Sequence, residues 1–192
     1  MEFDNSFDLP LPPAKAWALL MDIPRVAPCM PGAQLTEIVD PQNFKGKIAV
    51  RLGPVALTFD GRVAFETIDH ANQTARVKAQ GSDAKGRGAG SATAMFRIEP
   101  AATGSKVLIH TDLTLSGAVA QYGRGAGMIQ ATAAQLVGQF AGNLQAQLGQ
   151  EQSVANHDVP RVLSAAKPIS GLSLLIRVIC SRFAALFSGL RM

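Results

Sequence analysis

The chain has 192 residues, of which 47% are hydrophobic and 17% are charged. This length suits one domain with a proper core plus an appendage, and the composition excludes a disordered chain. The formal net charge is +4, yet five of the 18 Lys and Arg residues and only two of the 14 Asp and Glu residues lie after residue 150. The excess positive charge therefore lies in the C-terminal tail, which argues against a nucleic-acid-binding domain and for an anionic partner of the tail.

The first ten residues have neither the basic segment nor the apolar segment of a signal peptide. The two cysteines, Cys29 and Cys180, lie in parts of the chain that look unrelated. We therefore expect no disulfide framework and a reducing, cytoplasmic setting.

Strand patterns dominate the N-terminal part of the chain. A short strand is predicted over 2–9, and a helix over about 12–21, because Pro12 and Pro13 suit the first turn of a helix. A loop is expected from Pro24 to Gly32. Five later runs alternate apolar and polar side chains with a period of two, which is typical of half-buried strands; they are 43–52, 55–66, 74–80, 91–99 and 106–115.

Short turns separate these runs, so the sequence predicts an antiparallel meander with one wet face and one apolar face. The segment from Ala118 to Gln150 supplies a cover for the apolar face, because its apolar residues recur at steps of three and four. The order of strand, short helix, further strands and long helix predicts an α+β fold. In this fold a curved antiparallel sheet of about seven strands wraps around a long C-terminal helix.

The composition divides the chain into a domain over 1–150, a linker over 151–168 and an amphipathic tail helix over 169–192. The tail is long enough to span a bilayer, but Arg177 and Arg182 lie inside it.

On a helical projection of the tail, Arg177 and Arg191 fall on a serine-rich stripe opposite a wide apolar face, and only Arg182 lies on the apolar side. This pattern favours a helix lying in the membrane interface, with a groove on a protein and true spanning left as alternatives. The residues expected at the membrane are Leu172, Leu175, Ile176, Arg177, Ile179, Arg182, Phe183, Leu186, Phe187, Leu190 and Arg191.

Several short motifs follow one another in a characteristic order within the first 150 residues. They are Trp17–Asp22, Ala27–Gly32, Gly53–Val55 followed by Phe59–Gly61, the glycines at 86, 88 and 90, and Leu115–Gly123. In these motifs the chain resembles the G subunit of carbon monoxide dehydrogenase (CoxG), a branch of the START-like (SRPBCC, helix-grip) superfamily.

The resemblance implies a helix-grip fold and a non-enzymatic protein that accompanies a molybdenum hydroxylase such as aerobic carbon monoxide dehydrogenase. It further implies recruitment of that enzyme to the cytoplasmic face of the cell membrane, as a peripheral protein. The ligand it implies is an isoprenoid quinone (menaquinone or ubiquinone), or another lipophile, held in the helix-grip cavity without a covalent cofactor. The partners it implies are the carbon monoxide dehydrogenase-like complex and the lipid surface.

The apolar inward positions are either packed core or cavity wall, and the sequence leaves both interpretations open. The candidate ligand-binding residues are Trp17, Met30, Phe44, Leu57, Phe59, Phe65, Phe96, Leu113, Tyr122, Ile129, Ala133, Leu136 and Phe140. The hydroxyl of Tyr122 is a candidate donor to a quinone carbonyl, although both Tyr122 and Trp17 are equally well read as core aromatics. Small inward residues leave volume unfilled and favour a cavity: Ala75, Ala79, Ala94 and Ala133.

No metal or catalytic constellation is expected. His70, His110 and His157 fall in a turn, on the wet face of a strand and in the linker. Cys29 has no base nearby in the sequence pattern.

The glycines at 86, 88 and 90 precede a strand rather than a helix, so they predict a hairpin loop or a lid rather than a phosphate site. Two alternatives to a ligand carrier remain. One is a passive anchor or assembly factor with a filled core, and the other is a cyclase-like or hydrolase-like enzyme of the same superfamily.

Overall fold

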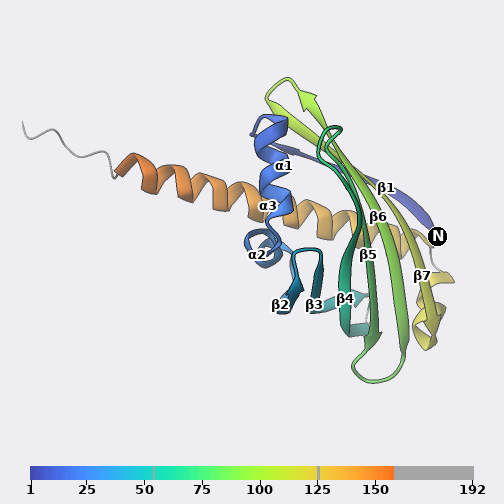
Figure 1. The fold of residues 1–192 in the computed structure, drawn as a ribbon. Helices are drawn as coiled ribbons and strands as arrows, with labels where there is room; N and C mark the ends of the chain where they lie inside the picture. Colours follow the sequence, from blue (N-terminus) through green and yellow to red (C-terminus); the bar gives the residue numbers. More distant parts are fainter. Residues whose placement is uncertain (54, 125, 158–192) are drawn as a thin grey trace, which may run out of the picture. The chain divides into compact units, whose positions relative to one another are not determined.

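The computed structural model describes residues 1–53, 55–124 and 126–157. Seven strands form one curved antiparallel sheet, and helices lie on its concave side (Figure 1). The elements in chain order are β1 (Glu2–Leu9), α1 (Pro13–Met21), α2 (Ile23–Val26), η1 (Ala27–Cys29), β2 (Ala33–Asp40), β3 (Asn43–Leu52), β4 (Val55–Asp69), β5 (Thr74–Asp83), β6 (Gly88–Ala101), β7 (Gly104–Gly117), η2 (Ala118–Arg124) and α3 (Ala126–His157).

The strands are ordered β1-β7-β6-β5-β4-β3-β2, and each neighbouring pair is antiparallel. From β2 to β7 the chain runs as successive hairpins, whereas α1, α2 and η1 carry it from β1 at one edge to β2 at the other. Aspartates close two of the turns, because Asp40 accepts the backbone N–H of Asn43 at 2.9 Å and Asp69 that of Asn72 at 3.0 Å. This arrangement confirms the predicted helix-grip fold.

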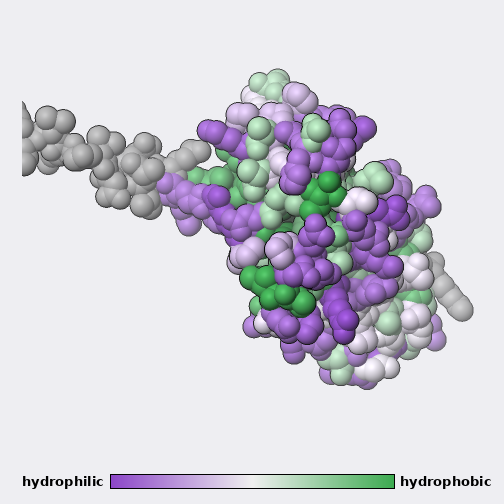
Figure 2. Space-filling view, in the orientation of Figure 1, coloured by the Kyte–Doolittle hydropathy of each residue, from purple (hydrophilic) through white to green (hydrophobic). Residues whose placement is uncertain are grey.

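The edge strand β2 pairs irregularly with its neighbour β3. Its register with β3 shifts between Leu35 and Glu37 and again between Ile38 and Asp40. Such irregularities discourage a second chain from adding to an open edge. Figure 2 shows a largely hydrophilic surface with separate hydrophobic patches, one of them over the β2–β3 hairpin, where Ile38 is 54% exposed.

The strand predictions at 2–9 and 43–52 coincide with β1 and β3. The four later strands extend beyond their predicted ends, because their hairpin arms continue past the residues that alternate clearly. No alternating run marked β2, whose exposed outer half carries little pattern. The expected loop at Pro24–Gly32 is wrong in part: it contains most of α2 and all of η1.

The long helix differs from its prediction at both ends. Residues 118–124 form the 3-10 segment η2 instead of α-helix, and α3 continues to His157, into the predicted linker. The rest of that linker and the whole predicted tail helix lie outside the described residues. Within the described part of the chain, no helix is both long enough and apolar enough to cross a bilayer.

The buried side chains form two clusters rather than one. The larger cluster joins α1 to the C-terminal half of α3 and includes Phe7, Trp17 and Leu144. The smaller cluster includes Leu57, Val119 and Ile129, from β4, η2 and the start of α3. Most of the smaller cluster borders the cavity described below.

Candidate functional site

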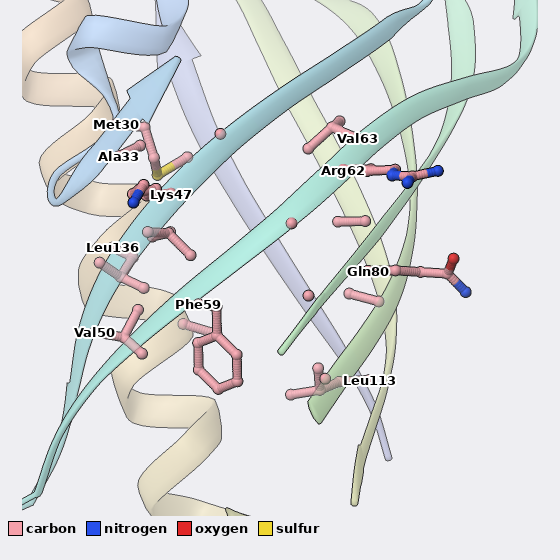
Figure 3. Close-up of a pocket in the computed structure, with 18 of the residues that line it drawn as sticks. Met30, Ala33, Lys47, Val50, Phe59, Arg62, Val63, Gln80, Leu113 and Leu136 are labelled. Atoms are coloured by element: carbon pink, nitrogen blue, oxygen red, sulfur yellow. The ribbon is translucent and has the colours of Figure 1, made fainter. Parts of the chain in front are cut away.

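A cavity of about 470 Å³ lies between the concave face of the sheet and α3. This volume falls within the range of small-molecule sites. Its lining comes from all seven strands, from α2 and η1 at one end, and from η2 and α3 at the other. In Figure 3, Val50, Phe59, Leu113 and Leu136 surround the open space.

Strand alternation makes the lining apolar. On β3 the side chains of Phe44, Ile48 and Val50 face inward, whereas Lys45 and Lys47 face outward, because successive side chains of a strand point to opposite faces. Lys45 is paired with Glu37 at 2.9 Å and Lys47 with Asp60 at 3.1 Å. The charged residues around the cavity therefore contribute backbone and stems, and Figure 3 shows Arg62 and Gln80 extending away from the apolar side chains.

Four glycines form a row across the inner face of the sheet. The register pairs Gly46 with Gly61, Gly61 with Gly81 and Gly81 with Gly90, on strands β3 to β6. Directly opposite residues of an antiparallel sheet point to the same face, and all four glycines line the cavity. We call this set the glycine row. Because four adjacent strands contribute no side chain along this row, space is left on the inner face of the sheet.

Seven of the predicted ligand-binding residues lie in the cavity wall. They are Met30, Phe44, Phe59, Leu113, Ile129, Ala133 and Leu136. Phe59, Leu113 and Leu136 are only half-buried, although they are large and apolar. The side chain of Tyr122 lies outside what the structure describes.

The other five predicted residues belong to the packed core and do not line the cavity. The Trp17 ring meets His70 edge-on at 5.7 Å between centroids and donates from Nε1 to His70 Nδ1 at 3.0 Å. Phe96 lies 5.8 Å from the Trp17 ring. Phe65 packs against Phe44, Phe140 packs against Phe7, and Leu57 is fully buried in the smaller cluster.

The small inward residues predicted from the sequence also divide between cavity wall and packed core. Ala79 and Ala133 line the cavity, together with Ala92, which the sequence did not single out. Ala75 is 2% exposed and belongs to the larger core cluster, and Ala94 is absent from the lining. Sequence reasoning also missed wall residues whose inward position depends on pairing across the fold, among them Phe3, Leu35, Val50 and Leu115.

The glycines at 86, 88 and 90 do not form one loop. Gly88 and Gly90 belong to β6, and the turn before them is held by an ion pair between the buried Asp83 and the partly exposed Arg87. Arg87 donates from Nε to Asp83 Oδ2 at 2.7 Å and from Nη2 to Oδ1 at 2.8 Å. These hydrogen bonds hold the pKa of the Asp83 carboxyl well below its usual range.

Cys29 is buried, and its thiol donates to Gln147 Oε1 at 2.9 Å. Burial raises the pKa of this thiol, so it stays protonated and is a poor nucleophile. Asn143 also donates to the Cys29 carbonyl at 2.9 Å. Cys29 therefore ties η1 to α3, as expected of a structural cysteine.

His110 meets carboxylates that are remote in sequence. Its Nδ1 lies 2.8 Å from Asp4 Oδ1, and ligand atoms of Glu2, His110 and Asp112 lie within 4.8 Å of one another. Pairing of β1 with β7 creates this exposed cluster on the outer face of the sheet. It lies on the opposite face of the sheet from the cavity lining, which among the described residues contains no Asp, Glu, His or Cys. The described side chains that face the cavity are thus predominantly apolar.

Comparison with known proteins shows the family of the chain and agrees with its fold. Residues 6–149 match the model of the family described as the G subunit of carbon monoxide dehydrogenase (CoxG). No curated protein matches the sequence.

Among solved structures, a conserved protein from Geobacillus kaustophilus has a TM-score of 0.67 and 18% identity, covering 78% of this chain and 96% of that protein. The ZhuI aromatase/cyclase from Streptomyces sp. R1128 has a TM-score of 0.56 and 12% identity, covering 79% of this chain and 95% of that protein. A protein from Thermus thermophilus has a TM-score of 0.55 and 14% identity, covering 77% of this chain and 99% of that protein. At these identities the likeness is one of fold.

Proposed function

Because the chain belongs to the CoxG family of carbon monoxide dehydrogenase subunits, we propose that it is a non-enzymatic carrier of an isoprenoid quinone or a similar lipophile. In this proposal the cavity holds the ligand, and the chain recruits a molybdenum hydroxylase such as aerobic carbon monoxide dehydrogenase to the cytoplasmic face of the membrane. The carrier thereby links the enzyme to the quinone pool.

The observation that carries the proposal is a large apolar wall that is only half-buried. Phe59, Leu113 and Leu136 face the cavity and remain partly exposed, although burying apolar surface is worth roughly 25 cal/mol per Å². An apolar occupant would remove this surface from water. A polar occupant would lose its hydration against inward-facing side chains that are almost all apolar. The hydroxyl of Thr132 donates to Met128 O at 2.8 Å and is left only as an acceptor.

The same lining argues for a carrier over an enzyme. General acid–base catalysis needs a titratable side chain within hydrogen-bond reach of the reacting atoms. The described cavity lining holds lysines and an arginine only from the outward-facing positions of strands, and no Asp, Glu, His or Cys. The likeness to an aromatase/cyclase, at 12% identity, is one of fold and supplies no catalytic residue.

The direct test is native mass spectrometry of the full chain purified from membranes, followed by titration of emptied protein with a short-chain quinone. We expect a bound lipophile before extraction and saturable quinone binding afterwards. Ala133→Phe fills the cavity from α3 and should abolish both signals, whereas Ala134→Phe places the same side chain on the exposed face of the helix and should change neither. The carrier proposal is overturned if the wild-type protein is purified without a bound lipophile and does not bind added quinone.

A passive anchor predicts a different result in a membrane assay of carbon monoxide oxidation. If the chain only tethers the enzyme, Ala133→Phe will leave quinone-dependent oxidation unchanged as long as the variant is folded. If it carries quinone, the oxidation rate will fall while co-sedimentation of the enzyme with membranes persists.

A further inference from the structure

The glycine row exposes bare backbone to the cavity. Gly61, Gly81 and Gly90 line both the cavity and a polar depression on the outer face, so the sheet is one backbone thick along this row. The peptide groups of paired strands bond to one another across the ladder. The surface that they present therefore has no protruding side chains and has few hydrogen-bonding groups to spare.

Two of the four glycines are required by the backbone itself. A Cβ on Gly61 would lie 2.3 Å from the carbonyl oxygen of Gln80, and a Cβ on Gly46 would lie 2.8 Å from that of Gln34. Neither neighbour can move without disturbing the sheet, so glycine at these positions permits the close approach of strands. Curvature of the sheet explains Gly46 and Gly61 without any ligand.

At Gly90 no backbone atom stands in the way of a Cβ, and only a side chain lies close. The nearest atom to its Cβ position is the Leu115 side-chain Cδ2 at 3.3 Å, and the next is Phe59 Cε1 at 3.9 Å. Its backbone does not adopt the positive φ that favours glycine. Glycine weakens a strand interior relative to alanine, so its presence here costs stability and keeps space free.

The shape of the free space indicates what would fill it. Phe59 and Leu115 lie beside the floor at Gly90, and the Phe59 Cβ lies 3.4 Å from the Cβ position of Gly81. A flexible chain packs equally well between protruding side chains, whereas a planar group makes its closest contact with a floor that has no protruding side chains. A ring face on this floor also places its edge near the Phe59 ring, within reach of an aromatic contact.

We propose that the glycine row is the seat of a planar ring, the head of the lipophile, and that Gly90 sets the space available to it. This inference rests on the carrier function proposed above and adds the position of the ring of the ligand within the cavity. The flexible chain of the ligand then extends past Ala79 and Ala92, which occupy the next row of the sheet and also line the cavity.

The test compares two probes that share one chain: a naphthoquinone bearing a farnesyl group, and farnesol, which lacks the ring. In Gly90→Ala we expect quinone binding to weaken by about tenfold, because overpacking a close-fitting site costs about 1–3 kcal/mol, while farnesol binding stays within about threefold. Gly138→Ala is the matched control, since a Cβ there meets nothing within 4 Å on an exposed turn of α3.

Equal weakening of both probes by Gly90→Ala, or no weakening, would overturn the ring seat while leaving the carrier function intact. Failure of the wild-type protein to bind either probe would instead overturn the carrier function and the ring seat with it. A measurement on the unmodified protein covers the case in which Gly90→Ala does not fold. The amide proton signals of Gly61, Gly81 and Gly90 should show ring-current shifts with the quinone but not with farnesol, and unshifted signals would reject the seat.

Discussion

Asp83 and Arg87 form a bidentate ion pair, and the aspartate side chain is fully buried. The second Arg87 nitrogen also donates to the carbonyl of Ala56 at 2.9 Å, and the Arg87 carbonyl accepts from Val119 N at 3.2 Å. One residue thus joins the β5–β6 turn to the start of β4 and to η2. These contacts fix the positions of the strands beside Phe59, which is paired with Asp83 in the sheet register and lines the cavity.

We predict that Asp83→Ala lowers the Tm by at least about 5 °C, because it leaves the Arg87 guanidinium without its buried partner. Thermal unfolding followed by circular dichroism measures the effect. Asp60→Ala removes an exposed partner of Lys47 and should shift the Tm by no more than about 2 °C. Equal Tm shifts for the two variants would show that the Asp83–Arg87 pair stabilises the fold no more than an exposed ion pair does.

The same pair predicts a pH dependence. The pKa of Asp83 is lower in the folded protein than its ordinary value of 3.8, so the ion pair contributes its full stability above that pH. The contribution is lost as the pH falls below 3.8 towards the folded-state pKa. Urea unfolding between about pH 5 and pH 2 should therefore show a steeper loss of stability for the wild type than for Asp83→Asn. Parallel curves for the two proteins would contradict the assignment.

His110 should titrate above its usual pKa of 6.5, because the hydrogen bond to Asp4 favours the protonated ring. The resulting stabilisation is present below about pH 6.5 and is lost as the pH rises through the raised pKa. An NMR titration should show the His110 pKa falling in Asp4→Asn and in high salt, since the pair is exposed. A pKa that responds to neither change would exclude Asp4 as its cause.

The cost of truncating a leucine should separate core from cavity wall on the same helix. Leu144 is 0% exposed within the larger core cluster, so Leu144→Ala should cost about 3 kcal/mol of unfolding free energy. Leu136 already faces the cavity, so Leu136→Ala should cost about 1 kcal/mol or less. Chemical denaturation measures both, and a cost for Leu136→Ala as large as that for Leu144→Ala would indicate that this part of α3 is packed solid.

Removal of residues 158–192 should abolish binding to anionic lipid vesicles in a sedimentation assay. Replacing Arg177 and Arg191 by glutamine in the full chain should weaken binding by about 1 kcal/mol for each arginine on anionic vesicles, and by much less on neutral ones. Replacing Ser181 by alanine keeps the charge and serves as the control. Undiminished vesicle binding by residues 1–157 would locate the lipid contact in the domain and not in the tail.

The sequence by itself determined the fold class, because period-two and three-to-four-residue patterns depend only on local geometry. The alternation in 43–52 defines β3 residue by residue, and the apolar stripe from Ile129 to Leu144 identifies the helix that covers the sheet. The apolar character of the inner face follows from the same alternation. These features need no knowledge of which strand pairs with which.

Only the tertiary structure decided which inward residues are core and which are cavity wall. Trp17 and Phe59 look alike as inward aromatics, yet α1 delivers Trp17 to His70 and Phe96, whereas Phe59 stands beside bare backbone. The glycine row is invisible in the linear chain, because Gly46 and Gly90 become parts of one floor only through three successive strand registers. Local patterns specify the face on which a side chain lies, but free volume depends on what the paired strands and the covering helix place opposite it.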